Sequence, residues 1–167
     1  MLTNAMRDKL NEQIEVEFFS SNLYLQMSSW CAAQGLDGSA AFLLRHSDEE
    51  REHMMRLFNY LNETGAQAII PALEKPDTSY EGLLDVFTKI LDHEKFVTSK
   101  INELMEFAMG EKDFATVNFL QWYIAEQHEE EALFSGILDR IKLVGYDGRG
   151  IYLMDKEIGK KGLQAAQ

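Results

Sequence analysis

A carboxylate and an imidazole interrupt the apolar face of a predicted helix near residue 50. Glu50 and His53 are three residues apart, so their side chains project from the same side of a helix. In that spacing they can bind one metal ion together. The run from Asp48 to His53 is also compatible with a solvated acidic face beside a hydrogen-bonded core histidine, and a four-residue motif does not decide between the two.

Glu50 and His53 belong to a stripe that repeats every three or four residues, and three other stripes also have polar residues at their centres. The central residues of these other stripes are Glu17, Glu94, and the pair Gln127 and Glu130. The centres of helices of equal length coincide in a bundle, so we expect these side chains to meet in one layer. The stripe around Glu50 consists of Leu43, His46, Glu50, His53, Leu57 and Tyr60.

We interpret His46, one turn before Glu50, as a packed and hydrogen-bonded core histidine. Tyr24, on the stripe of Glu17, can likewise be a packing residue.

A layer of four buried glutamates needs compensating positive charge. An ionised carboxylate costs several kcal/mol to bury, and four carboxylates also repel one another. Two divalent cations balance this charge, His53 supplies a nitrogen ligand, and Gln127 can form a hydrogen bond with a metal-bound water. The alternative is four protonated glutamates bonded to one another. Oxygen-rich ligation with one imidazole suits iron or manganese, although Zn²⁺ can compete. Open positions between two such metals would admit oxygen.

Four long helices and a short fifth are predicted to position these residues in an all-α fold of one domain, residues 1–167, with the bundle at about 5–142. Thr3 or Asn4 is the expected N-cap of the first helix. The long helices cover about residues 5–34, about residues 38–64, the stripe from Leu83 to Ala108, and the segment between the N-cap candidate Asp113 and Gly145.

The segment from Thr64 to Ser79 has no helical period and contains both prolines of the chain, Pro71 and Pro76. Its 16 residues reach roughly 50 Å when extended, at about 3.3 Å each. A helix of about 28 residues is only about 42 Å long. The segment can therefore cross the whole length of the bundle, which allows the second and third helices to run parallel.

The tail from residue 146 to 167 contains a short amphipathic helix at about 148–160. Its apolar residues have no room in a core filled by four long stripes, so we expect them to face another subunit. These residues are Ile151, Leu153, Met154 and Ile158.

Composition excludes several classes of partner. The net charge is −12 over 167 residues, which argues against nucleic acid and anionic membranes and is compatible with cations as ligands. No apolar run approaches the roughly 20 residues of a membrane span. Cys31 is the only cysteine, and the N-terminus lacks the apolar segment of a signal peptide. We therefore expect a cytoplasmic protein.

The polar layer resembles that of the di-iron carboxylate bundles, in which two helices each supply a glutamate and two each supply an E-x-x-H pair. Glu50-x-x-His53 matches one pair, but Gln127-x-x-Glu130 replaces the second, which speaks against bacterioferritin and rubrerythrin. Bacterioferritins also carry a haem-binding Met directly after the first-pair glutamate. Arg51 occupies that position here, so we expect no haem.

Over essentially its full length, the chain resembles the bacterial non-haem ferritins, and its acidic block near residue 128 is specific to them. The stretches that carry the resemblance are Leu10-Asn11-Glu12-Gln13, Arg45-His46-x-x-Glu49-Glu50, Lys100-Ile101-Asn102-Glu103-Leu104, and Asn118-Phe119-Leu120-Gln121-Trp122-Tyr123 leading into Glu126-Gln127-His128-Glu129-Glu130-Glu131.

The resemblance implies a ferritin-like bundle that oxidises Fe(II) with O₂ or H₂O₂ and stores the ferric mineral in a hollow shell of twenty-four subunits. The short last helix would then line an internal contact of the shell. The resemblance also implies roles for individual residues. Glu17, Glu50 and His53 match the first iron site; Glu50 bridges to a second site with Glu94 and Glu130; Gln127 and Tyr24 lie beside the pair; and Glu49, Glu126, Glu129 and Glu130 match a third iron site.

Residue spacing alone supports the third site less strongly than the pair. Glu126, Glu129 and Glu130 lie within one helical turn, and Glu49 adjoins Glu50, so the four can converge beside the pair. They can equally form a solvated acidic face. Two other functions also stay open at this point, a di-metal oxidase or peroxidase that stores no mineral and a structural or cation-buffering bundle without redox chemistry.

Overall fold

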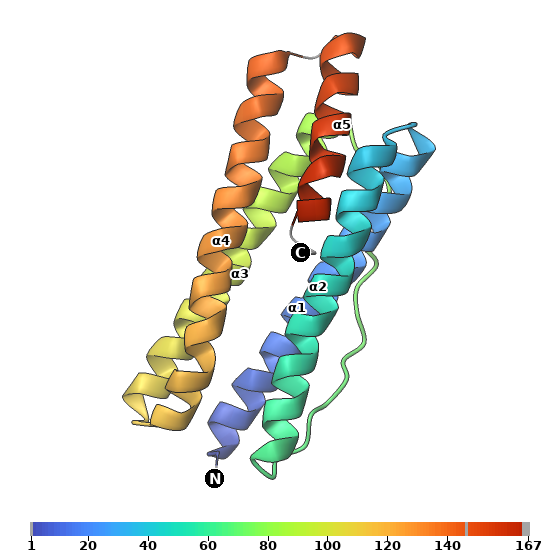
Figure 1. The fold of residues 1–167 in the computed structure, drawn as a ribbon. Coiled ribbons are helices and arrows are strands. Elements are labelled where there is room, and N and C mark those ends of the chain that lie inside the picture. Colours follow the sequence, from blue (N-terminus) through green and yellow to red (C-terminus); the bar gives the residue numbers. More distant parts are fainter. Residues whose placement is uncertain (1, 146, 165–167) are drawn as a thin grey trace.

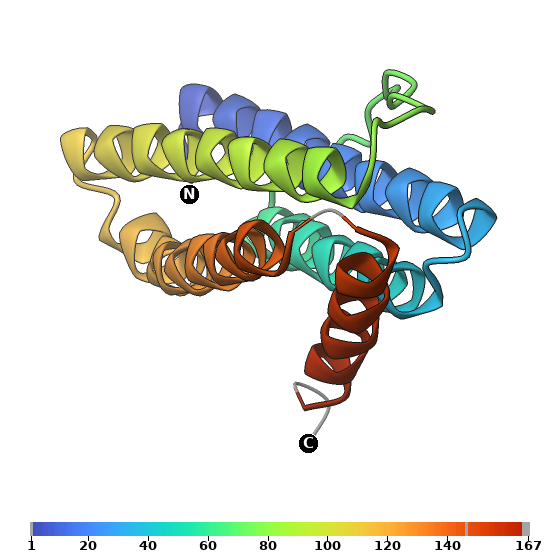
Figure 2. The same cartoon turned by 90° about the horizontal axis from the view of Figure 1, so that it is seen from above.

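The computed structural model describes residues 2–145 and 147–164, so residues 1, 146 and 165–167 of the predicted domain and tail lie outside the described residues. The described chain folds into two antiparallel helical hairpins, with a fifth helix packed across one end (Figures 1 and 2). The helices are α1 (Asn4–Ala33), α2 (Asp37–Glu63), α3 (Leu83–Gly110), α4 (Phe114–Val144) and α5 (Gly148–Gln164).

The helix ends follow the local sequence closely. The Thr3 hydroxyl accepts the backbone N–H of Met6 at 3.2 Å, so Thr3, and not Asn4, is the N-cap of α1. The predicted cap Asp113 is confirmed, because its carboxylate accepts the backbone N–H of Thr116 at 3.2 Å. Gly35 has a φ of +74°, which lets the chain leave α1 and turn directly into α2.

The crossover between α2 and α3 runs along the outside of the α1–α2 hairpin (Figure 1). The side chain of Asn11 fastens it to α1, donating to the carbonyl of Gln67 at 3.3 Å and accepting the N–H of Ile69 at 2.7 Å. The chain thereby returns to the end of the bundle where α2 began, and α3 runs parallel to α2. The predicted all-α fold with a long crossover is confirmed.

The core consists of two apolar clusters, one in each half of the bundle. One cluster is built around Tyr24, Phe42 and Phe134, and the other around Leu10, Leu57 and Tyr123. Fully burying each such side chain contributes about 1.5–3 kcal/mol. In every long helix the polar residues of the predicted layer lie between the residues of the two clusters, so the layer occupies the middle of the bundle.

The prediction that the apolar residues of the last helix face another subunit is wrong for two of them. Met154 and Ile158 are buried in the cluster that contains Phe42, within the same chain. Helix α5 crosses the end of the bundle at a steep angle and does not lie alongside the other helices (Figure 2). Its side chains Met154 and Ile158 can therefore pack onto the apolar cluster at that end. Ile151 is half-buried, and Leu153 is exposed.

Helix α5 is fastened to the start of α2 by Asp155. Its carboxylate accepts the backbone N–H of Gly38 at 3.0 Å and of Ser39 at 2.7 Å, which satisfies free donors at the N-terminus of α2. The two helices approach so closely that a Cβ on Gly38 would lie 2.1 Å from the carbonyl oxygen of Asp155. Helix α5 also ends at Gln164, later than the predicted end at about residue 160. No helix in the described ranges is long and apolar enough to span a membrane.

Candidate metal centre

Six polar side chains meet in the middle of the bundle, one or two from each long helix. Their exposed fractions do not exceed 6 %, so bulk water does not solvate them. They are Glu17 of α1, Glu50 and His53 of α2, Glu94 of α3, and Gln127 and Glu130 of α4.

Glu17, Glu50 and His53 form the first close group of possible metal ligands. One ligand atom from each lies within 4.8 Å of the others. The Nδ1 atom of His53 is 3.5 Å from a Glu50 carboxylate oxygen and 3.9 Å from Oε2 of Glu17. Gln13 donates to the other oxygen of Glu17 at 2.8 Å, while Oε2 of Glu17 has no hydrogen-bond partner. The structure thus brings together the three residues predicted for the first iron site.

Glu94 is held by two hydrogen bonds from opposite sides. The Tyr24 hydroxyl donates to Oε1 of Glu94, and the Gln127 amide donates to Oε2 at 2.9 Å. The amide of Gln127 also reaches the backbone carbonyl of Glu94 at 3.3 Å. These contacts place Tyr24 and Gln127 beside the layer and orient the Glu94 carboxylate. Glu94 is not a member of either close ligand group among the described residues.

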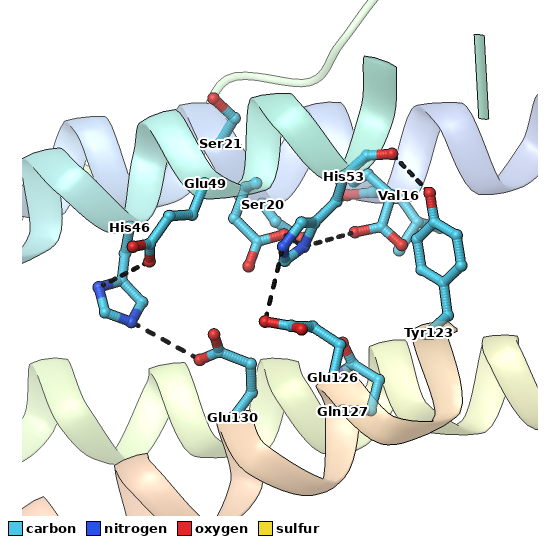
Figure 3. Close-up of polar contacts among 12 residues, drawn as sticks. Val16, Ser20, Ser21, His46, Glu49, His53, Tyr123, Glu126, Gln127 and Glu130 are labelled. Atoms are coloured by element: carbon cyan, nitrogen blue, oxygen red, sulfur yellow. Dashed lines mark hydrogen bonds and ion pairs between the residues drawn. The ribbon is translucent and has the colours of Figure 1, made fainter. Parts of the chain in front are cut away.

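Glu130 forms a second close group, with His46 and Glu49. Its Oε2 is 3.7 Å from Nε2 of His46, and Nδ1 of His46 is 3.5 Å from a carboxylate oxygen of Glu49 (Figure 3). The His46 ring packs against Phe42, with ring centres 4.2 Å apart, and its Nδ1 is 3.3 Å from the carbonyl oxygen of Phe42. The predicted packing and hydrogen bond of His46 are thus confirmed.

The proximity of His46 to Glu130 was not predicted from the sequence. In the sequence, the position of His46 on the stripe of Glu50 and His53 was the only indication that His46 lies close to the layer.

A pocket of about 580 Å³ opens between α2 and α4 beside these groups. Glu126 lines this pocket, and its Oε1 lies 3.8 Å from Nε2 of His53 (Figure 3). Glu129 is an exposed residue of the same lining. The four residues predicted for a third iron site therefore line one pocket next to the layer. The lining residues are His46, Glu49, Glu52, His53, Arg56, Trp122, Glu126, Glu129, Glu130 and Leu133.

Burial makes negative charge unfavourable throughout the layer. It is the largest cause that raises the pKa of Glu17, Glu50 and Glu94, and the neighbouring carboxylates add to it. Burial, followed by Glu94 and Glu50, raises the pKa of Glu130 to about 10. These carboxyls therefore need either protons or cations in order to stay in the layer.

The hydrogen-bond donors around the layer are neutral. Burial and the neighbouring carboxylates raise the pKa of Tyr24 well above its usual value, so its hydroxyl keeps the proton that it donates to Glu94. Burial lowers the pKa of His46 to about 4, so its imidazole is neutral at pH 7. Positive charge from these side chains does not balance the carboxylates, and the layer is suited to metal cations.

A four-helix bundle with a long crossover and a carboxylate–histidine layer at mid-height defines the class of ferritin-like di-iron proteins. The family model described as a ferritin-like domain matches residues 7–144. A probable bacterial non-haem ferritin-like protein of Haemophilus influenzae is 52% identical over 165 residues, covering 99% of this chain and 100% of that protein. A bacterial non-haem ferritin of Escherichia coli is 49% identical, covering 95% and 96%. The chain belongs to the ferritin family.

Solved ferritin structures have the same fold. An open-pore ferritin of the archaeon Archaeoglobus fulgidus superposes with a TM-score of 0.93 at 40% identity, covering 95% of this chain and 98% of that one. A ferritin of Chlorobium tepidum gives a TM-score of 0.86 at 44% identity, covering 95% and 97%. The protein is a non-haem ferritin, and iron storage with ferroxidase activity is the function of that family.

Proposed function

We propose that the buried layer is a ferroxidase centre in which Glu17, Glu50 and His53 bind one Fe²⁺ and Glu50, Glu94 and Glu130 bind a second. The observation that carries this proposal is the close group of Glu17, Glu50 and His53, whose ligand atoms lie within 4.8 Å of one another in a site closed to bulk water. Two divalent cations offset four ionised glutamates. Iron is the substrate of this centre and becomes the stored cargo.

The reaction transfers one electron from each of two Fe²⁺ ions to a shared oxidant. With O₂, the electron pair and two protons give H₂O₂; with H₂O₂, the pair and two protons break the O–O bond and give two waters. Tyr24 and Gln127 orient the Glu94 carboxylate through their hydrogen bonds. The layer excludes bulk water, so the oxidant reacts at the irons without competition from solvent.

We propose that Glu49, Glu126, Glu129 and Glu130 bind a third iron in the pocket between α2 and α4. This pocket adjoins the ferroxidase centre through His53 and Glu130, which line both. Glu129 belongs only to the pocket. Replacing it with alanine should change the number of irons oxidised per O₂ more than the initial binding at the pair, and an unchanged ratio would count against the third site.

Storage requires an enclosed space, and we propose that twenty-four copies of the chain form a shell in the cytoplasm, each copy a single domain of residues 1–167. Exposed apolar residues on α4 and α5 support association, since Leu143 is 86% exposed and Tyr152 is 60% exposed. Size-exclusion chromatography combined with a count of iron per chain tests this. A small monomer that keeps only a few irons per chain would instead indicate an oxidase without storage.

The site assignment is tested by aerobic addition of Fe²⁺ while oxidation is followed by absorbance. Glu50→Ala and His53→Ala should each slow the initial oxidation by at least tenfold, because each removes a direct ligand. Asp48→Ala is the matched control, since it removes an exposed carboxylate two residues from Glu50. Wild-type oxidation rates in Glu50→Ala and His53→Ala would refute the assignment, and a wild type that oxidises no iron would support a structural bundle.

A further inference from the structure

Gln13 is a buried polar residue beside the layer, and the proposed ferroxidase reaction gives it no role. It lies one helical turn before Glu17 on the same face of α1 and is only 3% exposed. Its Nε2 donates to Oε1 of Glu17 at 2.8 Å. Tyr24 and Gln127 also donate to a glutamate of the layer, but their hydrogen bonds go to Glu94. Gln13 therefore acts on Glu17 alone.

The hydrogen bond from Gln13 makes the two oxygens of Glu17 unequal. Oε1 accepts from Gln13, whereas Oε2 is buried without a hydrogen-bond partner and lies 3.9 Å from Nδ1 of His53. Glu94 differs, because both of its oxygens accept a hydrogen bond. The oxygen without a donor is the one that a cation can bind without displacing a hydrogen bond. In Glu17 this oxygen is Oε2.

The terminal torsion of a glutamate side chain does not fix the carboxylate by itself, because its energy minimum is broad. Gln13 supplies that restraint from the outer wall of the layer. It lines a small pocket of about 50 Å³ between α1 and α3, together with residues such as Lys9 and Leu104. A methionine of similar length would fill the same place without a donor. Volume alone therefore does not require an amide at position 13.

We propose that Gln13 is a positioning residue of the ferroxidase centre, which holds Glu17 so that Oε2, and not Oε1, binds the first iron. This inference rests on the proposed ferroxidase function, because it concerns the ligands of the first Fe²⁺. The carboxylate is oriented before the ion arrives, so less ordering is needed on binding. Gln13 touches the oxygen that faces away from the iron. Its loss should therefore weaken the binding of the first ion and leave the electron transfer unchanged.

A crystal structure of the wild-type protein soaked in Zn²⁺ tests the geometry, because zinc is redox-inert and gives an anomalous signal. We expect an ion about 2.1 Å from Oε2 of Glu17, while Gln13 keeps its hydrogen bond to Oε1. An ion held through Oε1, alone or together with Oε2, overturns the inference and leaves the ferroxidase centre standing. The same holds if Gln13 turns away from the carboxylate. If no ion binds at Glu17, Glu50 and His53, both proposals are overturned.

Solution binding provides the second test, with a matched pair of variants. Gln13→Met keeps the length of the side chain and removes the donor. We expect one class of Zn²⁺ sites to weaken by at least about tenfold in calorimetric titrations, as is typical when a hydrogen bond to a metal ligand is lost. Gln26→Met is the control and should match the wild type. Gln26 is a half-buried glutamine of the same helix, about 13 Å further along its axis than Glu17, at about 1.5 Å per residue.

Two readouts separate positioning from a general loss of structure. In crystals of Gln13→Met soaked in limiting Zn²⁺, occupancy at Glu17 should fall relative to the other zinc positions. In Fe²⁺ oxidation, the Fe²⁺ concentration for half-maximal rate should rise about tenfold, and the maximal rate should stay close to that of the wild type.

The inference fails if Gln13→Met binds Zn²⁺ with wild-type affinities, or if all zinc positions lose occupancy equally. A lower maximal rate at an unchanged half-saturating Fe²⁺ concentration would also overturn it. Circular dichroism and size-exclusion chromatography establish that each variant is folded and assembled like the wild type. The wild-type crystal structure decides the question if Gln13→Met does not fold.

Discussion

Replacing Glu130 with glutamine should lower by about one the number of protons that each chain releases when it binds divalent cations at pH 7. Burial and the neighbouring Glu94 and Glu50 raise the pKa of Glu130 to about 10. Only about one Glu130 side chain in a thousand is then ionised at pH 7 in the metal-free protein. A metal ligand must be deprotonated, so binding displaces this proton. Glutamine has the same shape and carries no such proton.

The size of the effect follows from the environment of Glu130. A pKa raised from 4.5 to about 10 corresponds to about 8 kcal/mol for ionising this carboxyl in the layer, at about 1.4 kcal/mol per pH unit. The bound cation must offset this cost. Each proton released makes the apparent affinity for the cation rise about tenfold per pH unit, so the pH dependence of binding should be less steep in Glu130→Gln than in the wild type.

Isothermal titration calorimetry with Zn²⁺ measures the released protons, if it is repeated at pH 7 in buffers of different ionisation enthalpy. The slope of the binding enthalpy against the buffer enthalpy gives the proton count. Glu17, Glu50 and Glu94, whose pKa values are also raised by burial, add to the wild-type count. Glu106→Gln, at an exposed glutamate of α3, is the control and should match the wild type.

A proton count near zero for the wild type would refute the reasoning, because it would mean that the buried carboxyls are already ionised before metal binds. Equal counts for Glu130→Gln and the wild type would exclude Glu130 as the source.

The raised pKa of Glu130 also predicts that the stability of the metal-free protein depends on pH. A folded pKa above the unfolded value means that the folded protein binds more protons, so the unfolding free energy of the metal-free protein should fall as the pH rises from about 4.5 towards 10.

Two further predictions concern residues around the layer and at the end of the bundle. Tyr24→Phe removes the donor to Glu94 and should slow Fe²⁺ oxidation several-fold while leaving the number of Zn²⁺ bound per chain unchanged; a wild-type rate would mean that this hydrogen bond does not matter for the reaction. Asp155→Ala leaves the N–H groups of Gly38 and Ser39 without their acceptor and should lower the unfolding free energy by about 1–3 kcal/mol. Hydrogen exchange at these two amides should accelerate in Asp155→Ala and stay unchanged in a Glu157→Ala control.

The bounds of the helices, and the position of the polar layer at the middle of the bundle, could be predicted from the sequence. Both depend on the spacing of residues within a single helix. Caps such as Thr3 and Asp113 act within one turn, and a stripe that repeats every three or four residues shows which side chains share a face. Polar residues at the centres of four stripes must meet when helices of equal length pack together. Glu17, Glu50 and Glu94 were therefore placed in one layer from spacing alone.

The tertiary structure decided what local spacing leaves open, namely the rotation of the helices against one another and the direction of the last helix. The rotation of α4 against α2 brings Oε2 of Glu130 within 3.7 Å of His46, although the two residues are far apart in the sequence. The direction of α5 depends on the close approach of Asp155 to Gly38 and buries Met154 in the chain's own core. The sequence by itself determined the four-helix bundle and the residues of the central polar layer, because both follow from helical periodicity. The partners of His46 and of α5 depend on contacts between distant segments.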